Sequence, residues 1–170
     1  MITLATKDDL IQVEMIMKSI KEEMRKEGNP QWGSTDDDYP SVAKLLDDIE
    51  KAKMLKFVED GQIKGVVSLA RDTAREYDGL LENSLEDSFI IHRLAVPQEY
   101  RKQKIATQLI QYAEVHAKNH QVNVLKSSTE VSNDKMNNFL LRHGFVHKGY
   151  YTYEDYPGTY CYYEKEIERS

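Results

Sequence analysis

Residues 88–110, SFIIHRLAVPQEYRKQKIATQLI, contain the stretch that decides the fold. Residues 88–96 are almost continuously apolar and stop at Pro97, which is typical of a central strand buried on both faces. Residues 103–119 then repeat apolar side chains at helical spacing, and residues 122–128 have the composition of a second strand. A strand, a crossover helix and a further strand predict a parallel pair joined by a right-handed connection.

The sequence on both sides of this unit predicts antiparallel hairpins and further helices. Asp60-Gly61 lies between two strand-like runs, residues 54–59 and 63–70, and such a dipeptide favours a tight hairpin turn. We therefore expect an α/β fold with a mixed, mainly antiparallel central sheet flanked by helices, in a single domain spanning residues 1–170. The remaining expected elements are helices at 8–26, 40–52 and 133–143 and strands at 2–6, 145–153 and 159–167.

Composition excludes several classes of protein. The 170 residues include 23 Lys and Arg against 29 Asp and Glu, a net charge of −6 that argues against a nucleic-acid partner. The single cysteine, Cys161, excludes an intramolecular disulfide, and no Cys/His cluster has the spacing of zinc ligands, so no metal is expected. No apolar run is long enough to cross a membrane. We expect a cytoplasmic protein.

The turn after the central strand carries a cluster of cations. Arg101, Lys102 and Lys104 lie where the following helix begins, and free amides at a helix start attract anions. Residues 91–150 hold nine Lys and Arg against four Asp and Glu, so this part of the acidic chain is locally basic. The cluster is either a phosphate-binding turn or a solvated basic loop, and charge alone does not separate the two.

Two longer stretches resemble a known family. HRLAVPQEYRKQKIATQLIQYAE and SNDKMNNFLLRHGF are similar to the two acetyl-CoA-binding motifs of the GNAT N-acetyltransferase superfamily. The segment with residues 28–32 and Tyr39-Pro40 resembles small bacterial members of the family, whose acceptors are mostly unassigned. The family's Arg/Gln-x-x-Gly-x-Gly/Ala motif matches residues 101–106. Its Asn-x-x-x-x-x-x-Tyr-x-x-x-Gly-Phe motif matches residues 133–145, and the expected order of elements is also that of the family.

The resemblance implies acetyl-CoA as co-substrate and assigns residues to it. The pantetheine arm would bind the backbone at the end of the central strand, the pyrophosphate would bind the amides of the turn with Arg101 beside them, and Asn133 would reach the arm from the second motif. The implied cofactor-binding residues are Leu94, Ala95, Val96, Arg101, Lys102, Gln103, Lys104, Ile105, Ala106 and Asn133.

Two positions depart from the family pattern. Lys104 stands where the family prefers glycine, whose missing Cβ lets the pyrophosphate approach closely, so cofactor affinity could be reduced. Leu140 stands where many members have a tyrosine that protonates the leaving thiolate, so this acid does not carry over.

Other residues are candidates for proton transfer and acceptor binding. His92 is the first candidate base, because histidine exchanges protons near neutral pH; the alternative is a core histidine bonded to backbone. Strand alternation would place it on one face with Ile90, Leu94 and Val96. Tyr153, or Tyr151, could replace the missing acid, although aromatic residues in strands usually only pack.

The acceptor side is expected to include Trp32, Tyr39 and Glu130, together with an acidic run at Asp36–Asp38. The negative charges would suit a cationic amine, although a solvated acidic loop is an equal alternative. Glu130 is alternatively an ordinary loop carboxylate.

These observations predict an enzyme that transfers an acetyl group from acetyl-CoA directly to a primary amine of a small molecule, or of a peptide or protein. The alternative is a non-catalytic acyl-CoA-binding or interaction module, because the motif glycine and the tyrosine are both replaced. An exposed edge on a terminal strand makes a homodimer plausible.

Overall fold

The computed structural model describes residues 1–33, 39–72, 87–152, 154 and 157–168. The predicted order of elements is confirmed, with the short helix α2 and two 3-10 turns, Lys7–Asp9 and Gln98–Tyr100, in addition. The elements are β1 (Ile2–Leu4), α1 (Leu10–Glu27), α2 (Pro30–Gly33), α3 (Val42–Glu50), β2 (Met54–Glu59), β3 (Gln62–Asp72), β4 (Ser88–Ala95), α4 (Ile105–Asn119), β5 (Val124–Glu130), α5 (Asp134–Arg142), β6 (Val146–Thr152) and β7 (Thr159–Glu166).

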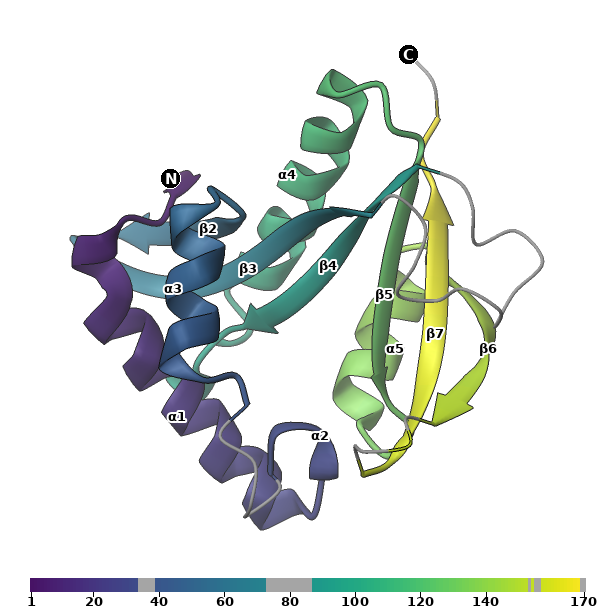
Figure 1. Cartoon of the computed structure of the whole chain (residues 1–170), viewed down its shortest axis with the longest axis horizontal. Helices are drawn as coiled ribbons and strands as arrows, with labels where there is room; N and C mark the ends of the chain where they lie inside the picture. Colours follow the sequence, from purple (N-terminus) through teal and green to yellow (C-terminus); the bar gives the residue numbers. More distant parts are fainter. Residues whose placement is uncertain (34–38, 73–86, 153, 155–156, 169–170) are drawn as a thin grey trace.

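The strands form one seven-stranded sheet in the order β1-β2-β3-β4-β5-β7-β6 (Figure 1). All neighbours are antiparallel except β4 and β5, which are parallel and are connected through α4, as expected. The edge strands are β1 and β6, and a homodimer through such an edge stays a prediction.

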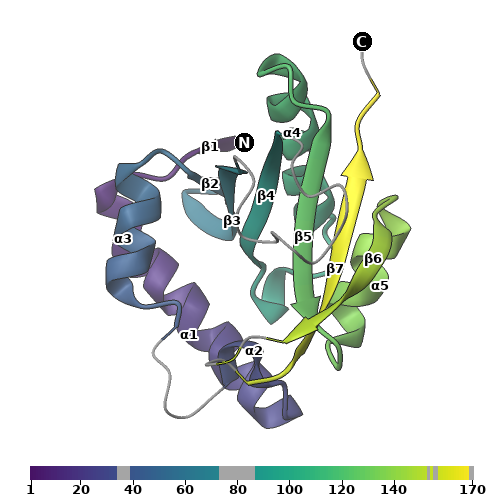
Figure 2. The same cartoon turned by 45° about the vertical axis from the view of Figure 1, so that its right-hand side comes forward.

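Helices cover both faces of the sheet, α1 and α3 on one and α4 and α5 on the other (Figure 2). The larger core cluster joins the sheet to α4 and α5, and includes Leu109 and Leu140, both fully buried. The second cluster joins α1 and α3 to β2, β3 and β4 through Met17, Leu45 and Val66. Among the described residues, no helix combines the length and apolarity needed to span a lipid bilayer.

Gly65 on β3 allows α4 to approach the sheet closely. A Cβ at this position would lie 2.8 Å from Cγ2 of Ile105 and 3.2 Å from Cγ2 of Val96. Real side chains do not approach so closely, so glycine is required for the first turn of α4 to pack where it does. The start of α4 is therefore held directly against β3 beside the end of β4.

The connection after α1 begins with a left-handed glycine and continues directly into α2. Gly28 does end α1 in the left-handed conformation, with φ 72°. Pro30 is instead the first residue of α2, a position where its missing N–H costs no hydrogen bond. The side chain of Asn29 accepts a hydrogen bond from the Gln31 amide at 3.0 Å and stabilises this start.

Candidate active site

The site lies where β4 and β5 separate. Their ladder consists of Phe89 opposite Leu125 and Ile90 opposite Lys126, and beyond it the two strands diverge (Figure 1). The C-terminal part of β4 continues to pair with β3 only. The side of this segment that faces β5 therefore has no strand partner among the described residues, and it can pair with an extended amide chain.

A β-bulge interrupts β4 at the same place. Val66 of β3 pairs with Ala95 and Ser68 pairs with His92, so β4 contains one residue more than β3 between these pairs. Arg93 lies in this bulge with φ 52°, the left-handed region that residues other than glycine rarely adopt. Bulges of this kind change the direction in which the following side chains point.

The bulge corrects the expected placement of His92. His92 keeps the regular alternation with Ile90, whose side chain packs on the face opposite α4 with tyrosines of β6 and β7. Leu94 and Val96 instead pack against the cluster formed with α4 and α5. The prediction that His92 shares a face with Leu94 and Val96 is wrong, because simple alternation assumes a strand without an inserted residue.

A buried ion pair holds the bulge. Nε and Nη2 of Arg93 both lie 2.6 Å from Oδ2 of Asp48 on α3, and the Arg93 and Asp48 side chains are 4% and 0% exposed. The same carboxylate oxygen accepts a hydrogen bond from Ser68 Oγ at 2.8 Å, and Arg93 Nη1 donates to the Tyr39 hydroxyl at 2.6 Å. One carboxylate thus links α3 and β3 to the bulge, and Arg93 links the bulge to Tyr39.

The turn into α4 offers free amides. Lys104 is the N-cap of α4, with φ 60° and no capping hydrogen bond from its side chain. The Gln108 amide donates to the Lys104 carbonyl, so the amides of residues 105–107 precede the first donor of the helical ladder. Lys102 and Lys104 are exposed beside them. These groups fit a pyrophosphate, and the left-handed backbone of Lys104 explains why the family prefers glycine here.

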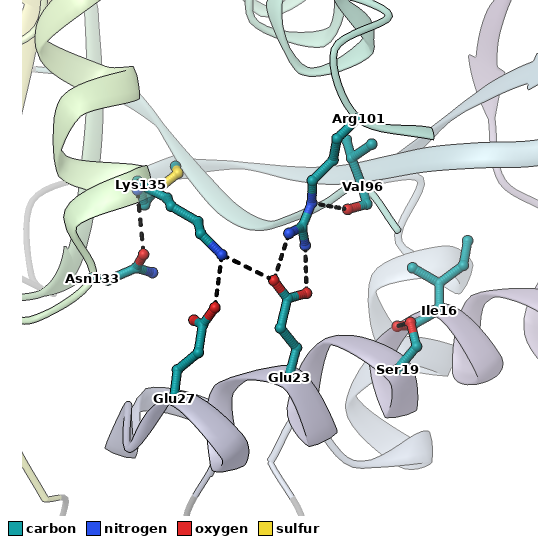
Figure 3. Close-up of polar contacts among 9 residues, drawn as sticks. Ile16, Ser19, Glu23, Glu27, Val96, Arg101, Asn133 and Lys135 are labelled. Atoms are coloured by element: carbon teal, nitrogen blue, oxygen red, sulfur yellow. Dashed lines mark hydrogen bonds and ion pairs between the residues drawn. The ribbon is translucent and has the colours of Figure 1, made fainter. Parts of the chain in front are cut away.

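The side chain of Arg101 has a different partner from the one expected. Its terminal nitrogens contact the Glu23 carboxylate of α1 at 2.5 and 2.6 Å, and its Nε donates to the Val96 carbonyl at 3.0 Å (Figure 3). Glu23 therefore already neutralises this guanidinium. The carboxylate comes from α1, far away in the sequence, and the placement of Arg101 beside the pyrophosphate stays a prediction.

Asn133 serves as the N-cap of α5. Its Oδ1 accepts from the Met136 amide and its Nδ2 donates to Thr129 Oγ1, both at 3.2 Å. These bonds fix the start of α5 next to the end of β5. The contact between Asn133 and the cofactor arm stays a prediction.

The expected acceptor side is joined to the end of β5. Gln31 of α2 accepts hydrogen bonds through Oε1 from Thr129 Oγ1 at 3.0 Å and from the Glu130 amide at 3.1 Å. Glu130 as a whole is only 4% exposed, and its carboxylate accepts a hydrogen bond from the Ser132 amide at 2.7 Å. Glu130 therefore organises the turn after β5 in this structure.

The aromatic acceptor candidates have unequal surroundings. Trp32 is a core residue, 6% exposed, in the cluster beneath α1 and α3. Tyr39 is half-buried and binds Arg93, which connects it to the bulge of β4. The acidic run Asp36–Asp38 lies outside the described residues. Tyr39 is thus the aromatic candidate that contacts the β4 bulge.

The tyrosine position of the second motif provides no acid. Leu140 is fully buried in the core. Tyr163 packs in the same cluster and donates its hydroxyl to Asn137 Oδ1 at 2.6 Å, and burial raises the pKa of Tyr163 to about 12. Tyr153, the alternative acid, lies outside the described residues. No group of three His, Cys, Asp or Glu side chains in the described part of the chain could hold a metal.

The sequence interpretation did not identify Asp48, Arg93 or Glu23. Two of them carried a signal, because Arg93 interrupts an otherwise apolar strand and Asp48 lies between apolar positions of its helix. A charged side chain at a buried position requires a partner, so the two could have been paired. Glu23 has no comparable signal, since it is one acidic residue among several on α1.

Comparisons with known proteins agree with this geometry. The chain is 25% identical over 165 residues to the uncharacterized N-acetyltransferase YesJ of Bacillus subtilis (strain 168), covering 96% of this chain and 88% of that protein. A GNAT-family acetyltransferase structure from Streptococcus agalactiae superimposes with TM-score 0.81 and 22% identity, covering 99% of this chain and 96% of the other. The PaiA N-acetyltransferase of Thermoplasma acidophilum, solved in complex with coenzyme A, gives TM-score 0.71 and 20% identity, covering 98% of both chains.

The sequence pattern of the Acetyltransferase (GNAT) family matches residues 15–145, most of the chain. This range contains most of α1, both motifs and the diverging strands. The chain therefore belongs to the GNAT acetyltransferase family and is an acetyl-CoA-dependent N-acetyltransferase.

Proposed function

We propose that this enzyme acetylates the primary amine of a small molecule in the cytoplasm, at the divergence of β4 and β5. The observation that carries the proposal is that two features, the end of β4 and the start of α4, occur together beyond the short β4–β5 ladder. In the described part of the chain, the end of β4 has no strand partner on the side facing β5, and the next helix along the chain, α4, begins without a capping hydrogen bond from the Lys104 side chain. An extended amide chain and a pyrophosphate need these two kinds of partner, in this order.

The cofactor positions follow from this arrangement. Backbone groups of residues 94–96 would pair with the pantetheine arm, and the amides of residues 103–106 would hold the pyrophosphate, with Lys102 and Lys104 exposed beside them. Acetyl-CoA supplies an acetyl thioester, which an amine attacks directly. Amides fixed at a strand end also stabilise the charge that develops on the thioester oxygen.

His92 is the proposed proton acceptor. It is half-buried, and the register of β4 places it with Ile90 on the face opposite α4, which is also the face covered by α1 and α3. An amine must lose a proton to attack a thioester, so a base on the acceptor side serves the reaction directly or through a water. Tyr153 remains our proposed acid for the leaving thiolate.

The contacts of α2 favour a small acceptor over a polypeptide. Gln31 joins α2 to the end of β5 through two hydrogen bonds, and Tyr39 is bonded to the β4 bulge. Gln31 is thereby attached to β5 and Tyr39 to β4. Contacts from both diverging strands on the proposed acceptor side suit a compact amine better than an extended chain. Tyr39, Glu130 and Trp32 are the proposed acceptor-side residues.

The proposal is tested by incubating the protein with acetyl-CoA and a panel of small amines, peptides and lysine-containing proteins while free thiol is measured. We expect thiol release that depends on a small amine. Turnover only with peptides would overturn the small-molecule assignment. Coenzyme A binding without turnover across the panel would favour the non-catalytic alternative.

His92→Gln tests the assigned base. We expect kcat to fall by about 100-fold, the lower end of what general base catalysis contributes, with an unchanged KM for acetyl-CoA. His120→Gln, at the exposed end of α4, is the matched control and should retain full activity. A wild-type rate in the His92 variant would return this histidine to a structural role.

A further inference from the structure

The Glu23 carboxylate of α1 lies between two cations, Arg101 and Lys135, that follow different strands of the sheet (Figure 3). Arg101 contacts both of its oxygens, at 2.5 and 2.6 Å. Lys135 Nζ lies 3.3 Å from Glu23 Oε1 and 2.7 Å from Glu27 Oε1. Two carboxylates of α1 and two cations thus form one network in which the charges balance.

The two cations follow the two strands that diverge. Arg101 lies in the turn that leads from β4 to α4, and Lys135 lies in the first turn of α5, after β5. The strands last pair at Ile90 and Lys126, well before either cation. Glu23 on α1 therefore contacts both the β4–α4 turn and the start of α5, two segments that follow strands no longer paired with each other.

Arg101 also binds the backbone of the proposed cofactor site. Its Nε donates to the Val96 carbonyl at 3.0 Å, directly after β4. Val96 is the last residue of the segment assigned to the pantetheine arm. With three nitrogens of the planar guanidinium engaged, the position of Val96 relative to α1 is fixed by directional bonds.

The charges in the network indicate that Arg101 serves as the partner of Glu23 and not as a ligand of the phosphates. Hydrogen bonds from Arg101 hold the pKa of Glu23 below its usual value, and the Glu23 contact raises the pKa of Arg101. The Arg101 and Glu23 side chains are 32% and 20% exposed, so solvent screens the pair only partly. Lys102 and Lys104, which are exposed, are better placed to meet the phosphates.

We propose that Glu23 is a positioning residue for acetyl-CoA: it sets the separation between the end of β4 and the start of α5 by holding Arg101 and Lys135. The inference rests on the proposed placement of the cofactor at this divergence. The opposite role is a carboxylate that competes with the phosphates for the same two cations. The two roles predict changes of opposite sign in cofactor affinity.

Glu23→Gln separates these roles, because it removes the charge and keeps the size of the side chain. We expect the Kd for coenzyme A, measured by calorimetry, to rise on the order of tenfold. The KM for acetyl-CoA should rise in parallel while kcat at saturation stays within about twofold, since no reacting atom is touched. Glu22→Gln is the matched control, because in the described part of the chain Glu22 pairs with Lys26 in an exposed contact on the same helix.

A double-mutant cycle with Arg101→Gln tests the route of the effect. If Glu23 acts through Arg101, Glu23→Gln should add little in the Arg101→Gln background. Additive losses, an unchanged Kd or tighter binding in Glu23→Gln would each overturn the inference. Failure of the wild-type protein to bind coenzyme A would instead count against the proposed function.

Discussion

Two ion-pair centres flank the C-terminal end of β4, and they differ mainly in burial. In the first, Arg93 and Asp48 are 4% and 0% exposed and fix the bulge against α3. In the second, Arg101 and Glu23 are 32% and 20% exposed and connect the β4–α4 turn to α1. Both join an arginine near the end of β4 to a carboxylate of α1 or α3, the helices on the face opposite α4, so the comparison shows what burial changes.

Burial determines whether water can solvate the charge that is left when one residue of an ion pair is removed. Water can solvate Glu23 or Arg101 if the other is removed, so that contact is adjustable and suited to tuning affinity. Asp48 has no access to water, and its Oδ1 already lacks a hydrogen bond among the described residues, with Lys44 Nζ 3.8 Å away. We therefore expect the buried centre to control whether the site forms. The half-exposed centre is expected to control how tightly the site binds coenzyme A.

Arg93→Met gives the largest expected effect. It leaves the Asp48 carboxylate buried without its cation, which lowers the free energy of unfolding by about 3–5 kcal/mol. Urea unfolding followed by circular dichroism measures this change. Arg71→Met is the matched control, because Arg71 of β3 pairs with Asp87 in a contact with side chains 47% and 48% exposed, and it should lose less than about 1 kcal/mol.

The double variant Asp48→Leu, Arg93→Met sharpens the same comparison. Removing both charges should restore much of the lost stability, since apolar replacements of a buried pair are often neutral. Tyr39 loses its hydrogen bond from Arg93 and Ser68 loses its hydrogen bond to Asp48, so the recovery is incomplete. A double variant as unstable as Arg93→Met would mean that the bulge itself depends on the ion pair.

Lys104→Gly has an intermediate expected effect, at the start of α4. The left-handed φ of 60° is unfavourable for lysine, so glycine should raise the free energy of unfolding by about 1 kcal/mol. Lys104→Asn, which tolerates this conformation but keeps a Cβ, is the control for coenzyme A affinity. Because only glycine permits the closest approach of the pyrophosphate, we expect tighter binding by Lys104→Gly than by Lys104→Asn in calorimetry. Equal affinities would show that the Cβ does not limit cofactor binding.

The sequence predicted those parts of the fold that depend on local patterns. The strand at residues 88–96, the crossover helix and the Asp60-Gly61 hairpin each follow from periodicity or turn chemistry, and the structure confirms them. The unusual conformation at Lys104 was also predictable, because the family motif marks that position for glycine. These features need only a few neighbouring residues to be specified.

The missed parts of the site depend on contacts between distant residues. The bulge at Arg93 inverts the faces of Leu94 and Val96, and strand alternation cannot anticipate an inserted residue. The partner of Arg93 in this bulge is the Asp48 carboxylate, 45 positions away in the sequence. Glu23 meets Arg101 across 78 positions, so no motif surrounding residues 101–106 could reveal that the guanidinium is already paired.

The smallest expected effect is the pH dependence of the half-exposed centre. Because Arg101 lowers the pKa of folded Glu23 below that of the unfolded chain, about 4.3, the contact contributes stability above that pH and loses it as the pH falls through the folded value. The difference in unfolding free energy between wild type and Glu23→Gln should be at most about 1 kcal/mol at pH 7 and should shrink as the pH falls below about 4.3, the pKa of the unfolded chain. Urea titrations at pH 7, 5 and 3.5 measure it. A difference that persists at low pH would show that Glu23 contributes through packing instead of charge, and would remove the electrostatic contrast between the two centres.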